Sequence, residues 1–141
     1  MPFLIVEDGA AMRRSVRDIL RGMGIRYIVE AADGAEALQQ CRLLPPEVIV
    51  LDWVLPDFTG GEFLRLLRTA PDSPAPEANV IVMTAQPNAK ILAEANRWGV
   101  HSIIRKPFTQ RIMEERLELM TASPRPPGHA APGLLTLQPT G

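Results

Sequence analysis

The chain has 141 residues, with 15 basic and 16 acidic side chains and a net charge of −1 at pH 7. This length fits one ordinary domain, and without a basic run long enough to follow a phosphate backbone we expect no direct nucleic-acid partner. Cys41 is the single cysteine, which excludes an intrachain disulfide and suits a reducing compartment. No apolar stretch has the length of a membrane span and no signal pattern opens the chain, so we expect a cytoplasmic protein without a membrane partner.

Apolar residues along the chain alternate between the spacing of strands and the spacing of helices. Short apolar runs predict five strands, over residues 3–6, 27–30, 48–51, 80–83 and 102–105. A helical pattern follows each strand. Pro45-Pro46 is expected to end the second helix, while Pro87-Asn88 and Thr109 are expected to begin the last two. This alternation predicts a parallel sheet with helices on both faces, joined by right-handed crossovers.

The third predicted strand leads directly into a carboxylate. Its apolar residues, Val48–Leu51, lie ahead of the turn formers Pro56 and Gly60-Gly61, which is typical of a short strand buried on both faces. Asp52 is therefore expected at the carboxyl end of a central strand, the edge where open α/β sheets bind ligands. Taken alone, an aspartate in this position is more often a turn or cap residue.

Three other predicted strands also end in reactive or charged side chains. The first is followed by Glu7-Asp8, the fourth by Thr84 and the fifth by Lys106, and in a parallel sheet these ends lie on the same edge as Asp52. Three carboxylates in one cleft repel each other unless a cation lies between them, and oxygen ligands favour a hard ion such as Mg²⁺. The lysine and the threonine hydroxyl suit anionic oxygens. The set predicts phosphoryl transfer in which a carboxylate is the nucleophile and forms an acyl phosphate.

Five motifs, in order along the chain, resemble the receiver domains of two-component response regulators, including the single-domain chemotaxis type. They are Val6-Glu7-Asp8, Glu30-Ala31-Ala32-Asp33-Gly34-Ala35-Glu36-Ala37-Leu38, Leu51-Asp52 with Leu55-Pro56 and Gly60, Met83-Thr84-Ala85, and Lys106-Pro107-Phe108. The resemblance extends from about Phe3 to Met120. It implies a flavodoxin-like three-layer α/β sandwich, with five helices and a five-stranded parallel sheet in the order 2-1-3-4-5.

The resemblance also implies roles for individual residues. Asp52 would be the phosphorylated aspartate, Thr84 and Lys106 would bind phosphoryl oxygens, and Mg²⁺ would be held by Asp8, Asp52, the backbone carbonyl of Val54 and, mostly through water, Glu7. The donor would be a phosphohistidine on a sensor histidine kinase or on a histidine phosphotransfer protein. Hydrolysis of the aspartyl phosphate would be the off-step, so the protein would phosphorylate and dephosphorylate itself rather than act as a turnover enzyme.

Two positions depart from the family pattern. The family often has Tyr or Phe three residues before the lysine, as a rotamer switch linked to Thr84, whereas this chain has Ile103. A subtler shift at the fourth helix and fifth strand is therefore the expected readout. Val54 and Gln86 flank the place of the phosphoryl group, and because Val54 has no polar group to orient water, slow dephosphorylation is expected.

The domain organisation leaves several functions open. We expect a receiver domain over residues 1–121 and a Pro/Gly-rich flexible tail over residues 122–141, too short for a DNA-binding unit. The leading hypothesis is a stand-alone module whose affinity for an unknown output protein changes on phosphorylation. A phosphoryl relay or sink, and a receiver from a larger hybrid kinase or multidomain regulator, are the alternatives. A Mg²⁺-dependent phosphatase of similar topology is disfavoured because its second catalytic aspartate would fall on Val54.

Other conspicuous residues are expected to have structural roles. Cys41 lies on an apolar helical face and is expected to pack in the core. His101 and His129 have no second ligand at metal spacing, which argues against a transition-metal site. Trp98 is expected either to pack or to face a partner.

Overall fold

The computed structural model describes residues 2–122. Strands and helices alternate along the chain: β1 (Phe3–Val6), α1 (Ala10–Gly22), β2 (Ile28–Ala31), α2 (Gly34–Leu43), β3 (Val48–Asp52), α3 (Gly60–Thr69), β4 (Asn79–Thr84), α4 (Ala89–Arg97), β5 (Ser102–Arg105) and α5 (Gln110–Ala122). The strands form one parallel sheet in the order β2-β1-β3-β4-β5. The predicted flavodoxin-like topology is therefore confirmed.

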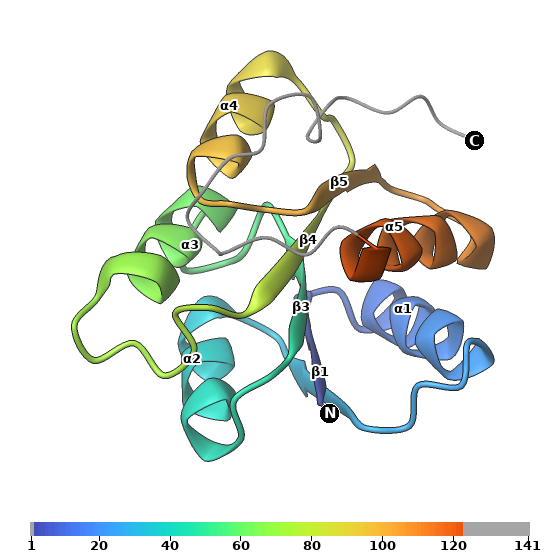
Figure 1. Ribbon diagram of the computed structural model, residues 1–141, viewed down its shortest axis with the longest axis horizontal. Coiled ribbons are helices and arrows are strands. Elements are labelled where there is room, and N and C mark those ends of the chain that lie inside the picture. Colours follow the sequence, from blue (N-terminus) through green and yellow to red (C-terminus); the bar gives the residue numbers. More distant parts are fainter. Residues whose placement is uncertain (1, 123–141) are drawn as a thin grey trace.

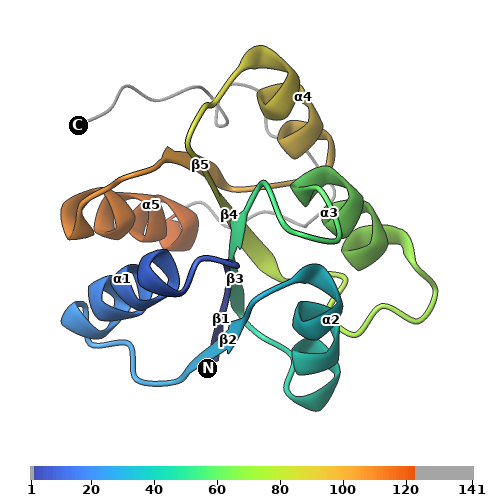
Figure 2. The same cartoon turned by 180° about the vertical axis from the view of Figure 1, so that it is seen from behind.

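The helices cover both faces of the sheet, with α1 and α5 on one side and α2, α3 and α4 on the other (Figures 1 and 2). Two apolar clusters fill the spaces between these layers, and all five residues of β3 are buried. Cys41 belongs to the cluster under α2 and α3, as expected, and burial raises the pKa of its thiol to about 11 despite the nearby charge of Arg42. The central strand thus has apolar cover on both faces, and its polar end, Asp52, is held rigidly.

Side chains at the starts of α2, α4 and α5 accept hydrogen bonds from backbone N–H groups, and two of these starts, at Asn88 and Thr109, were correctly predicted. The Asn88 side chain accepts a hydrogen bond from the Ile91 N–H at 2.9 Å and caps α4, and Asp33 caps α2 by accepting from the Glu36 N–H at 2.7 Å. The Thr109 hydroxyl accepts from the Ile112 N–H at 3.3 Å at the start of α5. These side chains satisfy backbone N–H groups that have no acceptor within the helix.

Element boundaries differ from the prediction in strands β2 and β4. Strand β2 covers residues 28–31 rather than 27–30, because pairing with β1 begins at Ile28, opposite Phe3. Strand β4 begins at Asn79, which pairs with Val48. Helix α2 ends at Leu43, as expected from Pro45-Pro46, because Leu44, directly before a proline, is sterically disfavoured from helical geometry.

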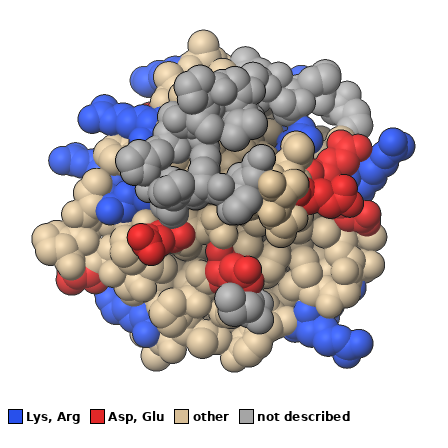
Figure 3. Space-filling view, viewed as in Figure 1, with Lys and Arg blue, Asp and Glu red and all other residues tan. Residues whose placement is uncertain are grey.

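Side chains of both charges lie on the face drawn in Figure 3, where Lys and Arg occupy separate groups toward the rim. Among residues 2–122, no helix combines the length and the apolar character needed to cross a membrane.

The tail expected from residue 122 onward lies outside the described residues except for Ala122, which closes α5. His129 also lies outside them.

Candidate functional site

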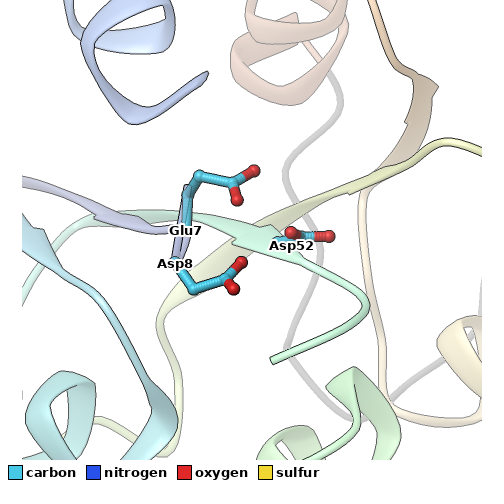
Figure 4. Close-up of side chains that lie close together, drawn as sticks. All are labelled: Glu7, Asp8 and Asp52. Atoms are coloured by element: carbon cyan, nitrogen blue, oxygen red, sulfur yellow. The ribbon is translucent and has the colours of Figure 1, made fainter. Parts of the chain in front are cut away.

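The structure brings three of the predicted carboxylates together at the carboxyl edge of the sheet. Glu7 and Asp8 directly follow β1, and Asp52 is the last residue of the neighbouring strand β3. One oxygen from each side chain lies within 4.8 Å of the others (Figure 4). Glu7 and Asp52 are buried, at 3% and 4% exposure, whereas Asp8 is exposed. The cluster therefore combines two carboxylates shielded from water with one at the mouth.

Lys106 supplies the positive charge of the cluster. Its Nζ lies 3.0 Å from Glu7 Oε1 and 3.1 Å from Asp52 Oδ2, so one ammonium bridges two buried carboxylates. Burial alone would lower the pKa of Lys106, but the hydrogen bonds and charges of Glu7 and Asp52 outweigh it and hold this pKa above its usual value. Lys106 is therefore a fixed cation facing Asp52, as the sequence predicts.

Thr84 completes the set of strand-end residues. It is the last residue of β4, is 4% exposed, and its hydroxyl oxygen accepts a hydrogen bond from the Gln86 N–H at 3.2 Å. Its backbone carbonyl accepts from the Lys106 N–H at 2.8 Å, which ties the ends of β4 and β5 together. Parallel pairing thus places the threonine and the lysine side by side on the same edge.

A small cleft opens over these groups. Eight residues line it: Glu7, Asp8, Asp52, Val54, Leu55, Pro56, Ala85 and Lys106. The Val54 side chain is 69% exposed, and its N–H donates to Asp52 Oδ1 at 3.2 Å. Val54 therefore lies where its side chain faces solvent and its backbone faces the carboxylate.

Ile103, the residue in the place of the aromatic switch, is buried at 2% exposure on β5. It belongs to the apolar cluster on the α2–α3–α4 side of the sheet, together with Trp53 and Val82. Trp98 packs against the same cluster, and Arg97 lies over its ring at 5.1 Å from the centroid. Packing is thus the structural role of Trp98, one of the two roles expected.

Two contacts near the site were not predicted. The Arg13 side chain donates to the Glu7 carbonyl at 2.8 Å and to Glu30 Oε1 at 3.2 Å, and so fixes the backbone that carries the acidic pair. The Asp57 carboxylate binds the first residues of α2, far from Asp57 in sequence. Helical spacing places Arg13 on α1, but no local pattern indicates its partner on β2 or the partner of Asp57.

The donor set suits a divalent cation. Three carboxylates face one ammonium, which leaves an excess of two negative charges in a partly buried cleft. All the available ligand atoms are oxygens, which hard cations prefer. Among residues 2–122, no side chain or backbone N–H forms a hydrogen bond or ion pair with the Asp8 carboxylate, so it is available as a ligand. The acidic cluster could therefore hold a metal ion.

Comparison with known proteins agrees with this geometry. Residues 3–118 match the model of the response regulator receiver domain. The chain belongs to this family. Receiver domains act in two-component signalling, where they pair with sensor histidine kinases, and a Mg²⁺-dependent phosphoryl acceptor role is the general function of the family.

The most similar relatives include chemotaxis regulators. Chemotaxis protein CheY of Pseudomonas aeruginosa is 34% identical over 118 residues, covering 84% of this chain and 94% of the relative. Chemotaxis protein CheY-3 of Vibrio cholerae is also 34% identical over 118 residues, covering 84% of this chain and 89% of its own length. The similarity thus extends over nearly the full length of single-domain regulators.

Solved structures give the same fold. Chemotaxis protein CheY4 of Vibrio cholerae superposes with a TM-score of 0.74 at 26% identity, covering 83% of this chain and 95% of that one. The receiver domain of a sensor histidine kinase from Pseudomonas aeruginosa, solved with a magnesium ion coordinated in its active-site cleft, has a TM-score of 0.74 at 24% identity. It covers 86% of this chain and 98% of that domain. At that identity the likeness supports the fold alone.

Proposed function

We propose that Asp52 is the phosphoryl acceptor of this receiver, that the reaction needs Mg²⁺, and that phosphorylation changes the affinity of the protein for an output partner. One observation carries the proposal: Asp52 lies in a cluster with Glu7 and Asp8 whose oxygens are within 4.8 Å of one another, with the Lys106 ammonium 3.1 Å from Asp52. An aspartate that only forms a turn or caps a helix does not require two further carboxylates and a lysine around it.

Four residues are proposed to hold the metal. Asp8 and Asp52 would bind it directly, the carbonyl of Val54 would add a backbone ligand, and Glu7 would act mostly through water. When bound, Mg²⁺ supplies positive charge that stabilises the phosphoryl oxygens during transfer. Gly9 N–H, which donates to Glu7 Oε2 at 3.0 Å, helps to hold Glu7 in place for this task.

The transfer step needs little covalent chemistry from the protein. An Asp52 oxygen attacks the phosphorus of a phosphohistidine on the donor, so that an O–P bond forms as the P–N bond breaks, and the imidazole leaves and takes up a proton. Lys106 and Thr84 bind oxygens of the incoming group, because both lie on the same sheet edge and both can donate hydrogen bonds. The donor is a sensor histidine kinase or a histidine phosphotransfer protein.

The phosphorylated state ends when the aspartyl phosphate is hydrolysed. The attacking water must approach from the mouth of the cleft, where the exposed side chain of Val54 offers no hydrogen-bonding group. Slow hydrolysis would make the phosphorylated form long-lived, which suits a module that acts by binding a partner. We place the responding surface at α4, β5 and α5, with Thr84 and Ile103 as the residues that report the state of Asp52.

Tryptophan fluorescence tests the metal site and the phosphoryl site together. Trp53 follows Asp52 directly and is buried, so its emission should respond to Mg²⁺ and then to beryllofluoride, a phosphoryl mimic. A Trp98→Phe variant removes the background, and Asp52→Asn in that variant is the control. Equal responses with and without the Asp52 carboxylate would overturn the proposal.

A further inference from the structure

The loop between β3 and α3 is closed by its own backbone hydrogen bonds. Val54 and Thr59 form an isolated antiparallel bridge, and the Leu55 N–H donates to the Phe58 carbonyl at 3.2 Å. At the exit of the loop, the Gly60 N–H donates to the Trp53 carbonyl at 2.6 Å. Because these bonds join the two sides of the loop, we expect a contact at its tip to affect the position of Val54 at its base.

The tip of this loop is fastened to another helix. Asp57 Oδ1 accepts from the Gly34 N–H at 2.8 Å, and Asp57 Oδ2 accepts from the Ala35 N–H at 2.9 Å. Gly34 and Ala35 open α2, where N–H groups have no acceptor within the helix and where negative charge is favoured. Asp33 caps the same helix by accepting from a different N–H group, that of Glu36. The two aspartates therefore bind different N–H groups of α2.

Apolar contact reinforces the attachment. The ring of Phe58, next to Asp57, lies so close to the Cα of Gly34 that a β-carbon at that position would overlap the ring. Figure 2 shows the loop passing over the start of α2. The tip is thus held by two charge-assisted hydrogen bonds and one ring contact, all on the first residues of α2.

From these contacts we propose that Asp57 is a positioning residue: by clamping the β3–α3 loop to α2, it holds Val54 where the metal site requires its carbonyl. The inference rests on the proposed function, because Val54 becomes a ligand only if Mg²⁺ binds beside Asp52. Val54 touches that carboxylate directly, with its N–H 3.2 Å from Asp52 Oδ1. Releasing the loop would let this backbone drift and would weaken the site without altering any ligand.

The experiment compares two aspartates at the same helix end. Mg²⁺ affinity is measured by Trp53 fluorescence in the Trp98→Phe background for Asp57→Ala, Asp57→Asn and Asp33→Ala. Asp57→Ala should weaken Mg²⁺ binding by about 10-fold, as loss of groups supporting metal ligands typically does. Asp57→Asn, which loses the charge but keeps a carbonyl acceptor, should recover part of the affinity. Asp33→Ala, which weakens α2 without freeing the loop, should bind Mg²⁺ as the unmodified protein does.

Three results would overturn the positioning role: unchanged affinity in Asp57→Ala, an equal loss in Asp33→Ala, or no recovery in Asp57→Asn. If Asp57→Ala does not fold, the Mg²⁺ affinities of Asp57→Asn and Asp33→Asn are compared instead. A protein without any Mg²⁺ response would refute the proposed function itself, and the clamp role with it. Unchanged Mg²⁺ affinity in Asp57→Ala, in a protein that does respond to Mg²⁺, would refute the clamp role alone.

Discussion

The ammonium of Lys106 lies 3.1 Å from the carboxylate of Asp52, at the ends of two strands separated by β4. Lys106 comes 54 residues after Asp52, and only the parallel order of the sheet brings them together. The contact joins the proposed phosphoryl acceptor to the proposed ligand of its phosphoryl oxygens. It also compensates part of the repulsion among the three carboxylates, so this lysine should affect both stability and chemistry.

Removing the lysine should destabilise the protein mainly when no divalent cation is present. Lys106→Met leaves Glu7 and Asp52 buried without their cation, which we expect to cost about 1–2 kcal/mol, between the values for exposed and fully buried pairs. Millimolar Mg²⁺ should restore part of this loss because it supplies the missing charge. Urea unfolding in EDTA and in Mg²⁺ measures both effects. Lys90→Met, at an exposed position on α4, is the control, and a similar loss in both variants would contradict the account.

Two adjacent glycines at the start of α3 should respond differently to alanine. A β-carbon at Gly60 would lie 2.5 Å from Cε3 of the buried Trp53 ring, which cannot move aside, so Gly60→Ala should cost about 1–3 kcal/mol. A β-carbon at Gly61 would meet only the carboxylate end of Glu94, which can rotate away. Gly61→Ala should therefore change the free energy of unfolding by less than about 1 kcal/mol, because better helix propensity offsets the lost contact.

Thermal unfolding of the two alanine variants, with Trp53 emission recorded in each, checks this contrast. Equal costs at the two positions would mean that the Trp53 ring is not the rigid neighbour that the structure shows.

The hydrogen bonds between the Asp57 carboxylate and the start of α2 should make the free energy of unfolding depend on pH under acidic conditions. Burial would raise the pKa of Asp57, but the hydrogen bonds from the Gly34 and Ala35 N–H groups outweigh it and hold the pKa below its ordinary value. A carboxyl with a lowered folded-state pKa stabilises the protein above its unfolded pKa, about 3.9, and this contribution is lost as the pH falls through the folded pKa.

The difference in urea midpoint between the unmodified protein and Asp57→Asn should therefore be present at pH 7 and shrink below about pH 4. Asp72→Asn, in the exposed loop after α3, controls for a general effect of charge. A difference that stays constant down to pH 3 would argue against the clamp.

Much of the site could be predicted from sequence because it lies at strand ends. A short buried strand is recognisable from its apolar run, and the parallel order then determines which strand ends share an edge, as for Asp52, Thr84 and Lys106. Asp57 could not be placed in this way, since an aspartate after a proline looks like any turn residue and its partners are 23 and 22 residues away. Nor does a sequence pattern show that Arg13 reaches the Glu7 carbonyl.

The start of α3 was predictable in principle. Thr59 and Glu62 form a capping box, in which the Thr59 hydroxyl accepts from the Glu62 N–H at 3.1 Å and Glu62 accepts from the Thr59 N–H at 2.8 Å. The spacing of these two residues is the usual signature of such a box. The capping box was missed because Gly60-Gly61 was interpreted as a pair of turn formers. In the structure both glycines belong to α3.

The residue at the mouth of the cleft should control the lifetime of the phosphorylated state. Val54 is 69% exposed and apolar, so it cannot orient the water that attacks the aspartyl phosphate. Val54→Asn introduces an amide at the same position and should speed dephosphorylation, leaving the unmodified protein the slower of the two. Decay of the phosphorylated form, followed by intact mass after the donor is removed, measures both rates. A faster unmodified protein would contradict this role.

The central claim is that Asp52 accepts a phosphoryl group in a Mg²⁺-dependent reaction. Intact-mass spectrometry after incubation with acetyl phosphate tests it most directly, with Mg²⁺ or EDTA, on the unmodified protein and on Asp52→Asn. We predict a gain of one phosphoryl group only in the unmodified protein with Mg²⁺. A gain in Asp52→Asn or in EDTA, or no gain in the unmodified protein with Mg²⁺, would contradict the account.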